Sequence, residues 1–280
     1  MSMLSRFFVK KKRKRVAVVV PLSTRSELTS EEQISLRHLV HFLGDYDKFL
    51  VVPKSHQMKL PGFGIKPFDN KFFGSASAHS KLLLSPIFYK TFMDYTFILI
   101  YHLDALVFSD QLTHWCEMDY DFIGPPWIKH PEAPYAGNLT YEGKVGNGGF
   151  SLRRIEAFLK VIYSKKYFIH PSEYWDVTYA KKPNYIHYLD FPKKIIKHLG
   201  IRNNARWEMS RYTRNEESFW ANRAISYYPQ FKIPPVEVAL RFAFECVPKY
   251  CFQQNNYTLP FGCHAWHKYD RDFWEPYLRR

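Results

Sequence analysis

The chain has 280 residues, of which 46% are hydrophobic, 18% aromatic and 24% charged, and its formal net charge at pH 7 is +14. This length and apolar content support a folded core and exclude an intrinsically disordered chain. No stretch approaches the roughly 18 to 20 apolar residues that span a bilayer, and the N-terminus lacks the features of a signal peptide, so we expect a cytoplasmic protein that is at most peripheral at the inner face of a membrane.

Half of the net charge lies in one short segment. Residues 1–15 contain seven basic and no acidic residues, which leaves +7 for the rest of the chain. Residues 6–15, which include Phe7 and Phe8, are typical of a segment that contacts an anionic membrane surface, and a solvated, disordered tail is the equal alternative. Because the excess charge is local, nucleic acid is not the expected partner.

The first 53 residues predict a strand, a helix and a strand. VAVVVPLS, residues 16–23, is a β-branched apolar run ended by Pro21, and KFLVVP, residues 48–53, is a second apolar run. Between them Ser30 stands three residues before Gln33, the spacing of a capping box, and an amphipathic pattern follows. This β-α-β order is the unit of a parallel sheet with helices on its faces.

The same alternation continues along the chain. Pro86 falls in a first turn of a predicted helix. Helices are expected near residues 80–93, 153–163, 191–199, 215–226 and 235–245, strands near 95–108 and 120–127, and a turn-rich loop over 128–149. We therefore predict an α/β fold, a single domain over residues 16–280 with a Rossmann-like, mostly parallel central sheet flanked by helices and a C-terminal extension.

Asp104 is the first candidate site residue. It interrupts the apolar run FILIYHLDALVF at the point where the predicted strand leaves the sheet. Ligands of open α/β sheets bind at the carboxyl ends of parallel strands, so this carboxylate is expected to face the ligand crevice. Beside a phosphate-bearing ligand a carboxylate commonly holds a divalent cation, whereas the simpler alternative is an Asp that caps a turn.

A glycine-rich segment, GKVGNGG, follows at residues 143–149 and opens into a short strand. Glycines let backbone amides approach a ligand closely, although the same residues also build a plain β-turn. The spacing fits neither a phosphate-binding P-loop nor a dinucleotide-binding fingerprint.

Acidic and histidine motifs come later in the chain. Thr213 stands three residues before Glu216, again a capping-box spacing, so Glu216 and Glu217 fall in a first helical turn. Acids there complement the helix dipole, or one of them serves as a general base. His264 and His267 lie in the aromatic stretch LPFGCHAWHKYDRDFW and could ligate a metal or be structural.

The order of these motifs resembles the glycosyltransferases with the GT-A fold. Their recurring elements are a DxD metal motif, a glycine-rich loop, an acidic xED motif at a helix start and a C-terminal His. The blocks LIYHLDALVF, DFIGPPW, VGNGGFSLRR, NEESFW, PVEVALRFAFE and LPFGCHAW are similar to those of a glycosyltransferase-like family formerly described as a domain of unknown function. The resemblance covers roughly residues 16–275.

The resemblance implies a role for each motif. Asp104 matches the last Asp of DxD, and His102 occupies the place of the first. Glu217 matches the base position of inverting members, directly after Glu216. His264 matches the C-terminal His, so Mn²⁺ or Mg²⁺ is expected on Asp104 and His264, with His267 the weaker ligand candidate. The residues expected to bind the donor are Pro21, Thr24, Arg25, Lys81, His102, Asp104, Gly146, Asn147, Gly148 and Gly149.

The function implied by the resemblance is transfer of a sugar from a nucleotide diphosphate sugar to a hydroxyl of a glycan or glycolipid acceptor, in surface polysaccharide assembly. The donor is expected on residues 16–150 and the acceptor and base on 151–280. Inversion of the configuration at the anomeric carbon is expected, and retention stays open. The alternatives are a protein that binds a sugar nucleotide without catalysis, or a module that binds a polyanion such as nucleic acid or an anionic membrane.

Overall fold

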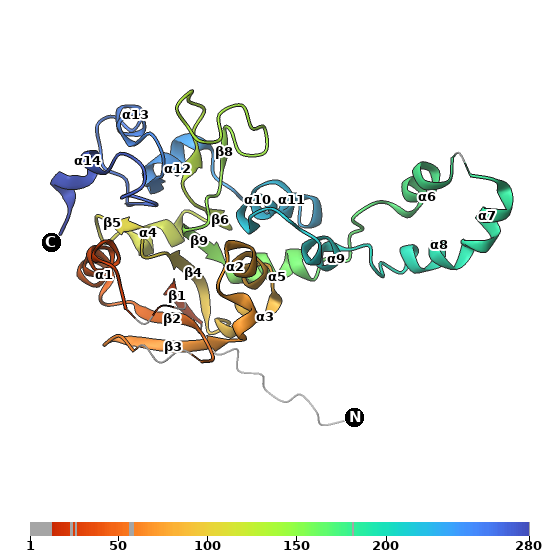
Figure 1. The fold of residues 1–280 in the computed structure, drawn as a ribbon, viewed down its shortest axis with the longest axis horizontal. Coiled ribbons are helices and arrows are strands. Elements are labelled where there is room, and N and C mark those ends of the chain that lie inside the picture. The colour runs from red at the N-terminus through yellow and green to blue at the C-terminus, as the bar shows by residue number, and fades with distance from the viewer. Residues whose placement is uncertain (1–12, 23–24, 26, 56–58, 181, 280) are drawn as a thin grey trace, which may run out of the picture.

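The computed structural model describes residues 13–22, 25, 27–55, 59–180 and 182–279. Thr24 and most of the basic segment, residues 1–12, lie outside the described residues. Figure 1 shows a body built around one sheet and a helical arm that extends away from it.

A six-stranded sheet runs through the body in the order β3-β2-β1-β4-β9-β6. The pairs β1-β2, β2-β3 and β1-β4 are parallel, whereas β9 is antiparallel to both of its neighbours. The strands are β1 (Lys14–Pro21), β2 (Asp47–Pro53), β3 (Phe63–Phe68), β4 (Tyr95–Tyr101), β6 (Phe122–Ile123) and β9 (Phe150–Arg154). The predicted α/β class with a mostly parallel central sheet is therefore confirmed, although β3 was not foreseen.

Both faces of this sheet are buried, which explains the unbroken apolar run of β1. Ala17 and Val19 belong to one core, which is covered by α3 and α5, and Val18 and Val20 belong to the other, which is covered by α1. Successive side chains of a strand point to opposite faces, so a strand with helices on both sides must be apolar at every position.

The predicted strand over residues 95–108 is in fact two strands. β4 ends at Tyr101, and β5 (Leu106–Val107) belongs to a second sheet with β10 (Ala243–Phe244) and β11 (Gly262–Cys263). A two-stranded sheet of β7 (Pro126–Trp127) and β8 (Lys144–Val145) closes the turn-rich loop. The break between β4 and β5 places Asp104 in a turn rather than in a strand.

Helices surround the sheet largely where the sequence predicts them. The predicted helix over residues 80–93 is divided into α2 and α3, because Pro86 starts a new helix at its first position. No helix of the described residues is long and apolar enough to cross a membrane. The helices are α1 (Ser30–Leu43), α2 (Ala76–Leu83), α3 (Pro86–Thr91), α4 (Leu112–Glu117), α5 (Ile155–Ile162), α6 (Pro171–Tyr179), α7 (Asn184–Leu189), α8 (Phe191–His198), α9 (Ala205–Ser210), α10 (Glu216–Asn222), α11 (Ala224–Tyr227), α12 (Val236–Phe242), α13 (Pro248–Gln254) and α14 (Arg271–Trp274).

Both predicted helix caps need correction. α1 is capped by Thr29 rather than Ser30: the Glu32 amide donates to the Thr29 hydroxyl (3.2 Å), and the Thr29 amide donates to the Glu32 carboxylate (2.8 Å). α10 begins after Asn215, where the backbone is not yet helical, and no side-chain hydrogen bond caps the helix. Thr213 therefore lies too far upstream to cap α10.

Candidate active site

Asp104 lies in the turn that follows β4, at the carboxyl end of the parallel strands. The turn is held from two sides: the His102 amide donates to the Gly149 carbonyl (2.8 Å), and the Trp266 amide donates to the Asp104 carbonyl (3.1 Å). The strand-end turn, the glycine loop and the C-terminal histidine stretch, far apart in sequence, thus meet at one place.

His102, Asp104 and His264 form a cluster in which one ligand atom of each lies within 4.8 Å of the others. Oδ1 of Asp104 is 3.2 Å from Nε2 of His264. Burial opposes ionisation of both groups, but their mutual attraction outweighs it. The pKa of Asp104 is lowered well below its usual range, and that of His264, which also contacts Glu245, is raised to about 10.

Glu245 orients His264 from the other side. Its Oε1 lies 3.2 Å from Nδ1 of His264 and accepts a hydrogen bond from the Asn147 amide group (2.6 Å). A carboxylate on one imidazole nitrogen holds the ring so that the other nitrogen faces a metal, and it makes that nitrogen more basic. In this arrangement Nε2 of His264 is the nitrogen that faces Asp104.

The residues of the cluster fit a divalent cation. Oδ1 of Asp104 is buried, and its contact with Nε2 of His264 is an ion pair rather than a well-aligned hydrogen bond, so this oxygen can take a cation as a further partner. Burial lowers the pKa of His102 to about 4, so its imidazole is neutral and can offer a lone pair. A donor set of two imidazoles and one carboxylate suits Mn²⁺ better than Mg²⁺, which prefers oxygen ligands.

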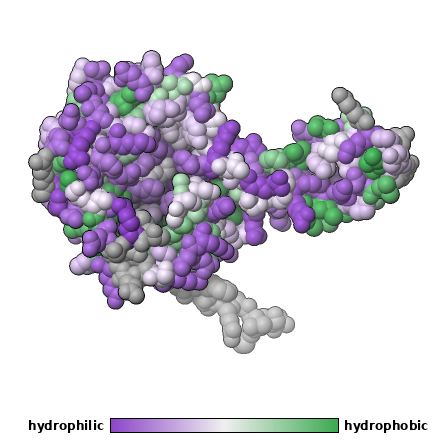
Figure 2. All heavy atoms as spheres, viewed as in Figure 1, coloured by the Kyte–Doolittle hydropathy of each residue, from purple (hydrophilic) through white to green (hydrophobic). Residues whose placement is uncertain are grey.

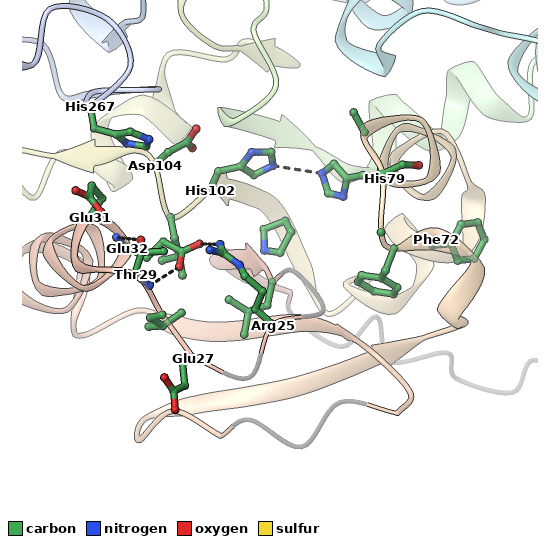
Figure 3. A pocket seen from close by; sticks show the side chains of 18 residues that line it. Arg25, Glu27, Thr29, Glu31, Glu32, Phe72, His79, His102, Asp104 and His267 are labelled. Carbon is green, nitrogen blue, oxygen red and sulfur yellow. Dashed lines mark hydrogen bonds and ion pairs between the residues drawn. The ribbon is translucent and has the colours of Figure 1, made fainter.

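His79 extends the cluster toward α2. Its Nε2 lies 3.2 Å from Nε2 of His102, and Figure 3 shows the two rings facing each other, with Asp104 between His102 and His267. Burial lowers the pKa of His79 to about 3. Two neutral rings can share one proton in a hydrogen bond, so His79 orients His102 without adding charge to the site.

The glycine loop packs against the cluster with no room for side chains. A Cβ built on Gly149 would lie 2.0 Å from Nε2 of His264, and one on Gly148 would lie 2.9 Å from Oε1 of Glu216. The Gly149 amide donates to the side-chain oxygen of Asn147 (3.1 Å). Close approach therefore requires glycine at both positions.

We expect Gly149→Ala to destabilise the fold by about 1–3 kcal/mol, because His264 must move to admit the methyl group. Gly149 does not have a positive φ, so contact rather than backbone strain is the cause. Denaturant unfolding of the variant in the wild-type and His264→Ala backgrounds checks this. The loss of unfolding free energy caused by Gly149→Ala should be smaller when His264 is truncated. An equal loss in both backgrounds would contradict the contact with His264.

Glu216 is engaged in a buried ion pair. Its Oε1 accepts from the Arg153 guanidinium (2.8 Å), and both side chains are almost fully buried. Arg153 also donates to the hydroxyls of Tyr89 (3.2 Å) and Ser151 (3.0 Å). These contacts tie α10 to β9 directly behind the glycine loop.

Glu216→Ala should cost about 3–5 kcal/mol of unfolding free energy, because it leaves the Arg153 guanidinium buried without its counter-ion. Urea denaturation measures the loss. The double variant Arg153→Met, Glu216→Ala removes both charges and should recover part of it. A loss as small as that of a surface substitution would show that the pair does not stabilise the fold.

Glu217, the next residue, is half-buried and keeps its carboxylate free of this pair. Burial, followed by repulsion from Glu216 and Glu245, raises the pKa of Glu217 to about 8. A carboxyl whose pKa is near neutral is suited to accept a proton from a substrate.

Two cavities meet at the cluster. The first, about 640 Å³, extends from the strand ends to α1 and α2, and Pro21 is among its lining residues. Figure 3 shows this lining, with Arg25 and His267 labelled. The second, about 400 Å³, contains Glu217 and the glycine loop. His79 and His102 line both cavities, so a ligand in the first can reach the second at the cluster.

The structure brings most of the predicted site residues to these two cavities, with exceptions. Lys81 is exposed on α2 and lines neither cavity, because that helix turns it to solvent. Gly146 packs against Phe122 behind the loop.

Arg25 lies in the first cavity and pairs with Glu32 (2.5 Å). His267 lines the first cavity but is not part of the metal cluster.

Three residues of the site were not predicted from the sequence: His79, Arg153 and Glu245. Glu245 carried a usable signal, because an acidic residue inside the apolar run RFAFECV is as unusual as Asp104 in its own run. His79 and Arg153 carried none, since their roles depend on partners far away in sequence.

The sequence pattern of a protein family described as "Protein of unknown function (DUF5672)" matches residues 62–264. This range contains the Asp104 turn, the glycine loop, Glu217, Glu245 and His264. No curated protein matches the chain.

Several solved structures resemble this one at low sequence identity. GlyE, a glycosyltransferase of Streptococcus pneumoniae TIGR4 in its apo form, is 12% identical with a TM-score of 0.42; the match covers 94% of this chain, which spans only 60% of the GlyE chain. A glycosyltransferase involved in the glycosylation of the major capsid of PBCV-1 is 10% identical with a TM-score of 0.41, over 94% of this chain and 98% of that one. The catalytic domain of Drosophila beta1,4galactosyltransferase 7, in complex with xylobiose, is 20% identical with a TM-score of 0.27, over 53% and 52%.

Proposed function

The chain belongs to the DUF5672 family, and we propose that this member is a glycosyltransferase that moves a sugar from a nucleotide diphosphate sugar to a hydroxyl of an acceptor. One observation carries the proposal. A half-buried His-Asp-His cluster with the chemistry of a cation site lies at the junction of two cavities, one of which contains a glutamate with a raised pKa.

The donor would occupy the first cavity, mainly on residues 16–150. Its base and ribose would lie near Pro21 and Arg25, and its diphosphate at Asp104 and His264. These two residues, with His102 beside them, would hold Mn²⁺ or Mg²⁺, which when bound neutralises the diphosphate and stabilises it as a leaving group. The donor sugar would then lie against the glycine loop.

The acceptor would enter the second cavity, to which residues 151–280 contribute Glu217 and Tyr269 and the preceding part of the chain contributes the rest of the aromatic lining. Trp127, Tyr135, Tyr141 and Tyr269 line this cavity and offer aromatic faces for a sugar. Three of these aromatic residues come from the segment around the turn-rich loop, which would also exclude water from the donor.

Glu217 is the proposed base. As the acceptor oxygen forms its bond to the anomeric carbon, its proton passes to the Glu217 carboxylate, and the bond from that carbon to the diphosphate oxygen breaks with its electron pair leaving on the diphosphate. A single displacement of this kind inverts the anomeric carbon. A glycan or glycolipid of a surface polysaccharide, met at the cytoplasmic face of a membrane, is the proposed acceptor.

A thermal-shift and calorimetric panel of nucleoside diphosphates and nucleotide sugars, each with and without Mn²⁺, tests this function first. We expect the nucleotides that carry one particular nucleobase to stabilise the protein, and to do so more strongly with Mn²⁺. Transfer of the matching labelled sugar to glycan or glycolipid acceptors follows. Absence of any response to nucleotides would contradict the proposal and favour a polyanion-binding module.

A second candidate is a protein that binds the sugar nucleotide without turning it over. The histidine at position 102, where the DxD motif of the resembling glycosyltransferases has an aspartate, favours it. Metal-dependent donor binding with neither transfer nor donor hydrolysis would decide for this candidate.

A further inference from the structure

The arm, residues 164–204, contains α6, α7 and α8 and extends away from the body (Figure 1). Its two ends meet at the base, where Tyr167 pairs with Asn204 and the Ser164 hydroxyl donates to the Tyr227 carbonyl (2.8 Å). The arm contributes no residue to either cavity of the candidate site, so its role is separate from the proposed transfer chemistry.

The arm exposes large apolar side chains at a much higher density along the chain than the body does. Of the sixteen large apolar side chains that are exposed in the described residues, eight lie between residues 177 and 201. Figure 2 shows apolar residues on the arm among hydrophilic ones. The eight are Val177, Tyr185, Leu189, Phe191, Ile195, Ile196, Leu199 and Ile201. Such a concentration marks an interaction surface.

Helix α8 shows how this surface is presented. At 100° per residue, Phe191, Ile195 and Leu199 share one side of the helix and the lysines share the other. Lys194 and Lys197 lie over the rings of Trp175 and Tyr174 of α6, at 5.3 and 4.9 Å. The lysine side therefore packs on α6, and the apolar side faces outward, with Leu199 68% exposed.

The charge of the arm indicates what covers this apolar side. Residues 164–204 hold eight basic and three acidic residues, a net charge of +5. Lys165, Lys166 and Lys182 form no ion pair with any described residue. A second copy would bring two arms of equal charge together, whereas a bilayer with anionic headgroups offers both an apolar interior and the opposite charge.

We propose that the arm binds the surface of an anionic lipid bilayer, with Phe191, Ile195 and Leu199 in the headgroup region and the net positive charge of the arm attracted to the lipid phosphates. The ammonium groups of Lys194 and Lys197 lie over the α6 rings, so the attraction to the lipid phosphates comes from the net charge of the arm as a whole. This surface differs from the basic segment 6–15, and neither depends on the other.

The test is sedimentation of the full chain with vesicles of phosphatidylcholine alone, or of equal parts phosphatidylcholine and phosphatidylglycerol. We expect binding to the anionic vesicles only, weakened by salt and reduced at least about tenfold by Ile195→Glu with Leu199→Glu. The matched control is Ile87→Glu, an exposed isoleucine of α3 outside the arm. Deleting residues 1–12 should leave the effect of the arm variant unchanged.

A second readout protects the test against misfolding of the arm. Leu199→Cys carrying an environment-sensitive fluorophore should shift to the blue with anionic vesicles, and Val40→Cys on α1 should not. Binding that the arm variant leaves unchanged, or that disappears on deletion of residues 1–12 alone, overturns the proposal. The proposal is also overturned if the chain does not bind vesicles but self-associates in a concentration-dependent way that the arm variant abolishes.

Discussion

Replacing Glu217 by Gln is expected to lower kcat by about 10²–10⁴-fold while donor affinity stays within a small factor of wild type. The amide keeps the shape of the side chain but cannot accept the acceptor proton. Donor binding is measured by calorimetry and turnover by transfer of a labelled sugar. Glu237→Gln, an exposed glutamate of α12, is the matched control. Turnover of Glu217→Gln at the wild-type rate would contradict the assignment of the base.

The same residue predicts a pH dependence. Only the ionised carboxylate accepts a proton, and the pKa of Glu217 is about 8, so log kcat should rise with pH and level off near that value. Between its ordinary pKa of 4.5 and 8, the folded state holds a proton that the unfolded state has lost. Stability must therefore fall as the pH rises through this window. Glu217→Gln should flatten that decline in a series of melting curves, and an unchanged slope would contradict the raised pKa.

Asp104→Ala is expected to weaken Mn²⁺ binding at least about 100-fold and to abolish transfer, because it removes the only carboxylate of the cluster. In the wild type, Mn²⁺ and the matching nucleoside diphosphate at about 100 times their Kd should add about 2.7 kcal/mol to the unfolding free energy. The variant should show little of this stabilisation in thermal-shift measurements, whereas Asp272→Ala, an exposed aspartate of α14, should show all of it.

The outcome for Asp104 can be separated from that for Glu217. Asp104→Ala should lose metal-dependent donor binding and turnover together, whereas Glu217→Gln should lose turnover alone. Asp104→Asn serves as a further control of shape, since it keeps the volume of the side chain but not its charge. Full Mn²⁺-dependent stabilisation of Asp104→Ala would place the cation elsewhere or remove it from the function.

Local sequence patterns were sufficient for the class of fold. The apolar run of β1 predicts a strand buried on both faces, and such a strand requires helices on both sides, which the periodic patterns supply. Element boundaries were less accurate. The break between β4 and β5 and the cap at Thr29 depend on contacts within a single turn, and residue patterns carry little information about such contacts.

The arm shows a different limit of sequence patterns. A helix was predicted over residues 191–199, where α8 lies, but its amphipathic sequence suits equally a helix whose apolar side packs on the body. Only the structure shows that the lysine side packs on α6 and leaves the apolar side outside.

By itself, the sequence determined the class of fold and the order of the Asp104, glycine and His264 motifs, because periodicity and local residue spacing carry that information. The family followed from the resemblance of its sequence blocks. The tertiary structure decided which glutamate of the adjacent pair is free. Arg153 neutralises Glu216, and Glu245 joins Asn147 to His264, through contacts between residues that are far apart in the chain. Charges interact through space, so their partners, and hence their pKa values and roles, exist only once the chain is folded.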